Sequence, residues 1–156
     1  MNSAAPILPL KNKLIRRPLW KMKSVGDFLD LEYEQVMAHI QSGGLLWAFN
    51  IATRGSRIEP RVLAHCAVEK KMGEIAETGA MRKLTLGKVI NLILPPRNIR
   101  STELKRILSC SSCHIYALAK NNFKIVRKAT AKDGPDSYTV FQRASVEKFL
   151  EKRRMI

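Results

Sequence analysis

Two stretches of the chain carry the same apolar pattern at one constant offset, and this repeat limits the possible folds more than any other feature. The offset carries Val25 to Leu104, and it also pairs Leu29 with Leu108, Leu31 with Cys110, and Val36 with Ile115. Gly43 and Asn122 also match, and both residue types suit the position just after a helix. The repeat therefore predicts two copies of one small unit, with the first copy over residues 22–51.

Each copy is predicted to hold a short helix, a tight turn, a second helix and a strand. In the first copy we expect helices over 24–30 and 33–41 and a strand over 45–52. The second copy should have helices over 102–108 and 112–120 and strands over 123–128 and 138–143, joined by the turn-forming residues 133–136, with a last helix over 145–154. Between the copies, residues 60–80 indicate a helix, and 84–94 a helix or a strand.

The second copy resembles a known group of DNA-binding domains. Residues Thr102–Ser109, followed by Ile115–Lys120 and by the closing segment Arg143–Arg154, are similar to the helix-turn-helix and final helix of excisionase-like and MerR-like winged-helix domains. In that group a small residue usually stands three places before the leucine of the first helix; Gly26 fits, whereas Lys105 departs from the pattern. The resemblance implies a mainly α fold with small β wings, in two tandem winged helix-turn-helix units, and binding to double-stranded DNA.

Helix-breaking residues and the distribution of charge indicate the domain boundaries. We expect a basic N-terminal arm over 1–20, with a disordered tail as the alternative, an N-terminal winged helix-turn-helix-like domain over 21–94, and a C-terminal DNA-binding domain over 95–156, beginning at Pro95–Pro96. Residues 24–42 contain four acidic and no basic residues, whereas residues 97–156 contain 14 basic and 5 acidic residues. We therefore expect the C-terminal unit to contact DNA. The acidic copy would form a homodimer or bind a protein partner, unless Gln35 and His39 face DNA with the acidic side chains turned away.

The overall charge points to the same class of partner. The chain has 28 lysine and arginine residues against 13 aspartate and glutamate residues, a formal net charge of +15. Such a surplus indicates a polyanion, with nucleic acid first and an anionic membrane surface second. No apolar run approaches the roughly 18 residues that a membrane-spanning helix needs, so we expect no membrane-spanning segment. With nucleic acid as the preferred partner, no membrane partner is predicted. An odd cysteine count and no signal-peptide pattern predict a cytoplasmic protein with reduced thiols.

Several basic and polar side chains are candidates for contact with DNA. They are Ser111, Ser112, His114 and Lys120 of the second helix and its start, Arg127, Lys128 and Lys132 of the wing, and Arg153 and Arg154 of the last helix. Candidate arm contacts are Arg16, Arg17, Lys21 and Lys23. Hydroxyl and imidazole groups can bond base edges, and the cations neutralise phosphates. His114 could instead be a solvated surface residue, and the last arginines could simply favour a helix C-terminus.

The Cys110–His114 segment is compatible with three interpretations. Its spacing matches haem attachment, or Cys110 and Cys113 could bind zinc together with His65 and Cys66. In the third reading Cys110 is a small apolar core residue, which the helix-turn-helix pattern favours. We therefore expect no metal and no cofactor.

The sequence favours a non-enzymatic function. No glycine-rich phosphate loop is present and no Ser-His-Asp set can be argued from spacing, so no catalytic residues are expected. The predicted function is a sequence-specific DNA-binding protein, either a transcriptional regulator or a recombination accessory factor of the excisionase type. The alternatives are an RNA-binding or ribonucleoprotein assembly protein and a structural adaptor of a nucleoprotein complex.

Overall fold

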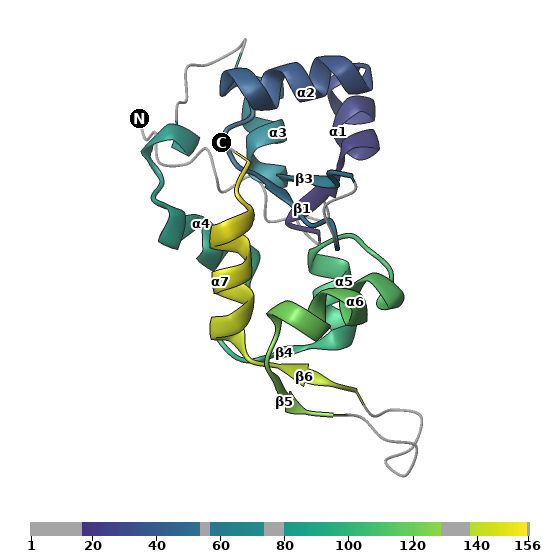
Figure 1. Ribbon diagram of the computed structural model, residues 1–156. Coiled ribbons are helices and arrows are strands. Elements are labelled where there is room, and N and C mark those ends of the chain that lie inside the picture. The colour runs from purple at the N-terminus through teal and green to yellow at the C-terminus, as the bar shows by residue number, and fades with distance from the viewer. Residues whose placement is uncertain (1–16, 54–56, 74–79, 129–137, 156) are drawn as a thin grey trace.

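The chain forms a mainly helical fold with two small antiparallel sheets (Figure 1). The computed structural model describes residues 17–53, 57–73, 80–128 and 138–155. The N-terminal unit consists of β1 (Leu19–Lys21), α1 (Met22–Leu29), α2 (Tyr33–Ser42), β2 (Ala48–Asn50), β3 (Pro60–Leu63) and α3 (Ala64–Met72). The 3-10 helix η3 (Ala80–Lys83) and α4 (Leu86–Ile93) connect it to the C-terminal unit. That unit consists of β4 (Ile99–Arg100), α5 (Ser101–Ile107), α6 (Ser112–Asn122), β5 (Ile125–Arg127), β6 (Val140–Phe141) and α7 (Arg143–Arg153).

The two units share their order of elements and their sheet topology. Each runs strand, helix, helix, strand, strand, helix, and the strand orders are β1-β3-β2 and β4-β6-β5. The pairing of the first strand with the last also agrees, because Trp20 opposes Val62 in the first sheet and Ile99 opposes Phe141 in the second. The step from Trp20 to Ile99 equals the step from Val62 to Phe141 and the step from Val25 to Leu104, so the offset found in the sequence holds for these strands and for the helix pair. The remaining strand departs from it, because Ala48 opposes Val62 whereas Ile125 opposes Phe141.

The turn between the two helices is the same in both copies. Asp30 and Ser109 follow α1 and α5 with φ angles of 58° and 52°, in the left-handed region. The amide of Leu31 donates to the Gly26 carbonyl at 2.8 Å, and the amide of Cys110 donates to the Lys105 carbonyl at 3.0 Å. A Cβ atom at Gly26 would lie 2.6 Å from the Leu31 carbonyl oxygen, so the first copy needs glycine there. The second copy accommodates a lysine at the equivalent place.

Three sequence expectations are corrected by the structure. The helix expected over 60–80 is present as α3, but its predicted start is wrong: residues 60–63 form β3, which lies between β1 and β2 with all four residues buried, and the helix begins only at Ala64. The arm expected over 1–20 ends earlier, because Leu19 and Trp20 are buried in β1. Gly43 ends α2 with a φ of 87° as expected, but Asn122 remains inside α6, where its side chain donates to the Leu118 carbonyl.

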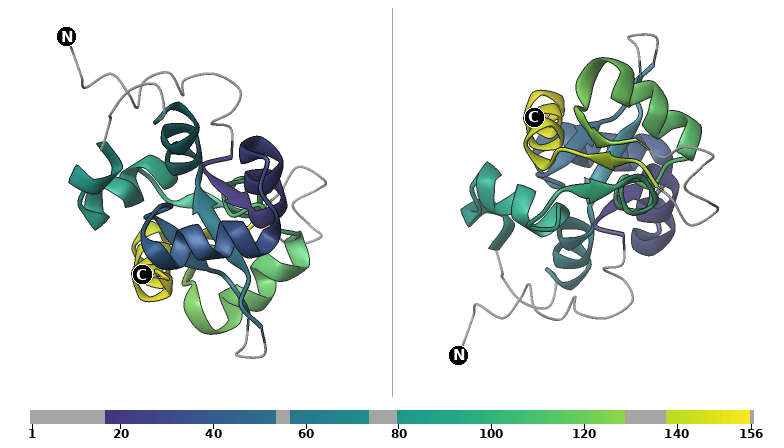
Figure 2. Two further views of the ribbon diagram at one scale, coloured as in Figure 1. Left: turned by 90° about the horizontal axis from the view of Figure 1, so that it is seen from above. Right: turned by 90° about the horizontal axis from the view of Figure 1, so that it is seen from below.

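The units are packed together over one continuous core. Buried residues from Leu19 to Leu150 belong to a single apolar cluster. The end of α7 lies against the N-terminal unit (Figures 1 and 2), where the Met155 amide donates to the Ala48 carbonyl at 2.8 Å. At the start of α7, the Arg143 guanidinium donates to the side chain of Asn91 at 2.8 Å and to the Pro95 carbonyl at 2.6 Å.

No helix in these described ranges is long and apolar enough to cross a membrane.

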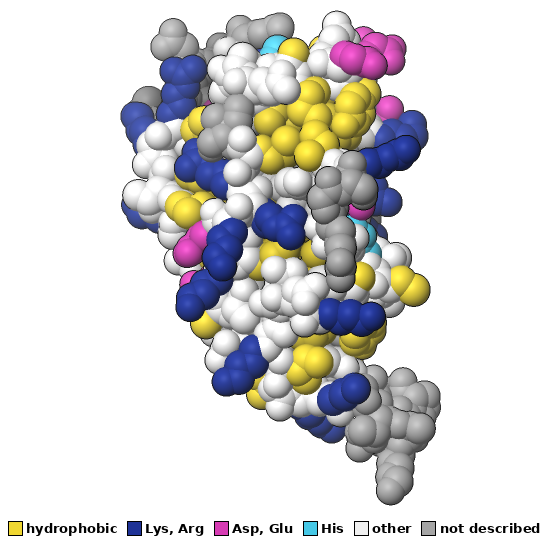
Figure 3. All heavy atoms as spheres, in the orientation of Figure 1, with side chains coloured by type: hydrophobic (Ala, Val, Ile, Leu, Met, Phe, Trp, Pro, Cys, Tyr) yellow, Lys and Arg dark blue, Asp and Glu magenta, His cyan; other side chains and the backbone are white. Residues whose placement is uncertain are grey.

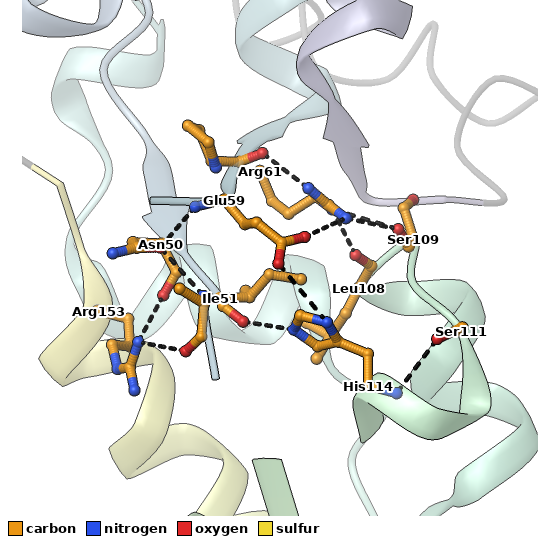
Figure 4. A network of polar contacts seen from close by, with 11 residues as sticks. Asn50, Ile51, Glu59, Arg61, Leu108, Ser109, Ser111, His114 and Arg153 are labelled. Carbon is orange, nitrogen blue, oxygen red and sulfur yellow. Dashed lines mark hydrogen bonds and ion pairs between the residues drawn. The ribbon is translucent and has the colours of Figure 1, made fainter. Parts of the chain in front are cut away.

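Arg61 of β3 makes the central polar contact between the units (Figure 4). The residue is 7% exposed, and its guanidinium donates to the Leu108 carbonyl at 2.8 Å and to the Ser109 carbonyl at 2.9 Å. Burial lowers the pKa of this guanidinium, and the nearby Glu59 carboxylate opposes that shift. The Ser109 hydroxyl in turn donates to the Leu19 carbonyl at 2.6 Å. The α5–α6 turn is therefore held on the N-terminal sheet.

We expect Arg61→Ala to lower the free energy of unfolding by about 3 kcal/mol, because the two turn carbonyls lose charged donors and stay buried. Urea titration followed by circular dichroism measures this change. Arg57→Ala is the matched control, since Arg57 is exposed. An Arg61→Ala protein as stable as the control would show that the turn is held by apolar packing alone.

Candidate nucleic-acid interface

Helix α6 presents one polar face to solvent. Its opposite face is buried through Ile115, Leu118 and Ala119, which pack into the core. The exposed positions are Ser112, Cys113, Tyr116, Lys120 and Asn121. At the start of the helix the Ser111 hydroxyl oxygen accepts a hydrogen bond from the His114 amide at 3.2 Å. This exposed face contains no carboxylate.

Five of the predicted contact residues lie exposed on α6 or on the neighbouring strand. Ser111, Ser112 and Lys120 belong to α6 and its N-cap, and Arg127 and Lys128 lie at the end of β5. In the ranges that the structure describes, Lys120, Arg127 and Lys128 form no ion pair. Lys132 lies outside the described residues. Tyr116 is 42% exposed and contacts the Phe141 ring edge-on.

His114 does not face outward, so this part of the sequence prediction is wrong. Its side chain is only 14% exposed, and Nε2 lies 2.6 Å from the Ile51 carbonyl oxygen of the N-terminal unit. Nδ1 lies 3.7 Å from the Glu59 carboxylate (Figure 4). The first turn of α6 abuts the N-terminal unit on this side, and the imidazole therefore joins the two units.

Arg153 and Arg154 are also engaged between the units, which corrects their assignment to phosphate contacts. The Arg153 guanidinium donates to the carbonyls of Asn50 and Ala52 at 3.2 and 2.9 Å. The Arg154 guanidinium lies 3.8 Å from the centre of the Trp47 ring. Both side chains extend from the end of α7 onto the β2 end of the N-terminal unit, where they find carbonyl and aromatic partners that the local sequence does not reveal.

The candidate arm residues have separate environments. Arg17 and Lys21 are exposed at the start of the N-terminal unit, and Arg16 lies outside the described residues. Lys23 is in α1, where it forms an exposed ion pair with Asp27 at 3.5 Å. An exposed pair of this kind contributes little to stability, so Lys23 can exchange partners.

The distribution of acidic groups separates the two units. Exposed Asp27, Asp30, Glu32 and Glu34 lie on α1, α2 and the turn between them, and Figure 3 shows a group of acidic side chains at this end of the molecule. In the C-terminal unit, Glu103 forms a bidentate pair with Arg97, with bonds of 2.8 and 2.7 Å. These bonds lower the pKa of the Glu103 carboxyl. Glu147 is paired with Arg143.

The three cysteines are free thiols in different surroundings. Burial raises the pKa of the Cys66 thiol to about 12 and that of the Cys110 thiol to about 11, whereas Cys113 is exposed. Within the part of the chain that the structure describes, no group of three or more His, Cys, Asp or Glu side chains is placed to hold a metal ion. Cys110 packs against the core, as its position in the helix-turn-helix pattern predicts.

Sequence reasoning missed Arg61 because it placed this residue in a helix. The repeat held the necessary signal: the strand expected over 138–143, moved back by the offset that relates Leu104 to Val25, falls on 59–64.

No protein family matches this chain, and no curated protein or solved structure is significantly similar to it.

The thiols should differ in reactivity, because the thiolate is the reacting form and burial disfavours it. We expect iodoacetamide at pH 8 to modify Cys113 first, Cys110 more slowly and Cys66 only after unfolding. Mass spectrometry of timed samples measures the order, and Cys113→Ser should remove the fast phase. Equal rates at Cys110 and Cys113 would contradict the half-buried position of Cys110.

Proposed function

We propose that this protein binds double-stranded DNA through its C-terminal unit, which acts as a winged helix-turn-helix domain. Helices α5 and α6 are the helix-turn-helix, the β5–β6 hairpin is the wing, and α6 enters the major groove. The observation that carries the proposal is the exposed face of α6, which is polar, contains Lys120 and has no carboxylate.

The arrangement of elements supports this role. In helix-turn-helix proteins the second helix lies in the major groove and its N-terminal residues contact base edges. Helix α6 has 11 residues and is about 16 Å long at 1.5 Å per residue, and a groove about 12 Å wide admits a helix. Ser112 stands at the first turn, where a hydroxyl can bond a base edge or a phosphate. Lys120 stands two turns further along the same face.

The charges near α6 favour an acidic partner. Arg127 and Lys128 at the base of the wing are exposed and, in the described ranges, free of ion pairs. Glu103 and Glu147 are paired with arginines, and residues 97–156 contain 14 basic against 5 acidic residues, so the C-terminal unit has a surplus of positive charge. Neutralisation of phosphates by such side chains releases counterions and supplies most of the non-specific affinity.

Helix α2 is not proposed as a second recognition helix. Glu32 and Glu34 stand at its N-terminus, where Ser111 and Cys113 stand in α6. Carboxylates at these places would be repelled by the DNA backbone. The protein would thus contact one groove through α6, as a transcriptional regulator or as an accessory factor in recombination.

The test uses the full chain, because the C-terminal unit depends on the N-terminal unit for the partners of Arg153 and His114. Selection from a random duplex pool first identifies a preferred site. Binding to that site, to a scrambled duplex, to duplex RNA and to single strands is then measured at several salt concentrations. Preference for one duplex DNA sequence supports the proposal, and preference for RNA or for no sequence would overturn it.

Two variants separate contact with the backbone from contact with bases. Arg127→Ala with Lys128→Ala should weaken specific and scrambled binding alike and make the salt slope shallower by about one per lost phosphate contact. Ser112→Ala should mainly reduce preference for the selected site, since a good base contact contributes roughly 1–3 kcal/mol of discrimination.

Arg82→Ala with Lys83→Ala is the matched control. It removes the same pair of charges from η3, which lies at the opposite end of the molecule from β5 (Figure 1). A control variant that loses as much affinity as the wing variant would show that binding depends on net charge and not on the proposed surface.

A further inference from the structure

A cationic cavity lies where the two units meet. It has a volume of about 420 Å³ and is open to solvent. Its lining residues are Arg17, Lys21 and Ser24 of the N-terminal unit and Ser109, Cys110 and Ser111 of the α5–α6 turn. The bond from the Ser109 hydroxyl to the Leu19 carbonyl joins its two sides. Neither unit alone would form this cavity.

The positive charge of the cavity is not neutralised by the described part of the protein. Arg17 and Lys21 are exposed and form no ion pair there. Glu59 acts on Cys110 of the lining, but its carboxylate lies between Arg61, at 3.8 Å, and His114, at 3.7 Å. Burial raises the pKa of the Cys110 thiol, and the positive charge of Lys21 opposes that shift. Two cations of this kind on one concave surface attract an anion.

Hydrogen-bond donors accompany the two cations. The Ser111 oxygen accepts the His114 amide, so its own hydroxyl proton remains available to a ligand. Ser24 adds a second exposed hydroxyl. The cavity also adjoins the first turns of α1 and α6. This combination of charges and donors fits the oxygens of a phosphate group.

We infer that this cavity binds a backbone phosphate of the duplex that α6 contacts, so that both units hold the same DNA strand. This inference rests on the proposed function. Ser111 belongs to the cavity and immediately precedes the exposed face of α6, so a strand bordering the groove would pass over the cavity. The N-terminal unit then contacts DNA through its basic β1–α1 edge, while the acidic side chains of α2 do not take part.

Two measurements test the inference. The first uses inorganic phosphate alone and the Cys113→Ser protein, in which Cys110 is the accessible thiol. Phosphate should slow alkylation of Cys110 by iodoacetamide about threefold relative to chloride at equal ionic strength, because a bound anion disfavours the thiolate. Arg17→Gln with Lys21→Gln should abolish this protection.

The second measurement uses duplex DNA and the protein that carries Arg17→Gln and Lys21→Gln. Its salt slope should be shallower than that of the unmodified protein by about 0.9 per lost phosphate contact. Arg82→Gln with Lys88→Gln is the charge-matched control, because both residues are exposed on the η3–α4 side, away from α6 (Figure 2).

The outcomes separate the two proposals. If duplex binding keeps its salt slope in the cavity variant and phosphate does not protect Cys110, the cavity inference is overturned and the proposed function stands. If the unmodified protein binds no duplex while phosphate still protects Cys110, the proposed function is overturned and the cavity remains a phosphate site.

Discussion

The Arg61 guanidinium belongs to the sheet of one unit but bonds to the backbone of the other. A buried cation is costly unless it is well hydrogen-bonded, and here the carbonyls of Leu108 and Ser109 satisfy it. These are the carbonyls of the α5–α6 turn, so the same bonds fix the turn and the start of α6. The cavity beside Lys21 and the start of α6 both adjoin this turn, which the Ser109 hydroxyl and the His114 side chain also hold on the N-terminal unit.

The constant offset between the two copies was the most productive sequence signal, because it reflects a repeated fold and not only a repeated composition. It anticipated both helix pairs, and the left-handed residues Asp30 and Ser109 show that the turns are equivalent. The β3 strand was missed since Pro60 to Leu63 is short and runs without a break into α3. A fully buried strand of four residues has no alternation to distinguish it from the first turn of a helix.

The exposure of the candidate residues was predicted well where it depends on local structure and poorly where it depends on the other unit. Ser112 and Lys120 share a helix face, which the helical period is enough to establish. His114 and Arg153 are bonded to carbonyls of residues 50–52 instead. Sequence spacing cannot show such partners, because the contacts join positions that are far apart along the chain.

The two copies share one arrangement of helices and strands but differ in their exposed side chains. Where α6 begins with serine and cysteine, α2 begins with Glu32 and Glu34. Arg61 of β3 and Glu59, just before β3, contact the second copy. A short recognition helix needs rigid support, since small errors in its direction displace every side chain that reaches a base. In most helix-turn-helix units that support comes from the unit's own core. Here the α6 N-terminus is also fixed by a neighbouring copy, so under the proposed function the acidic first copy can stabilise the DNA-contacting surface without placing its own second helix in a groove.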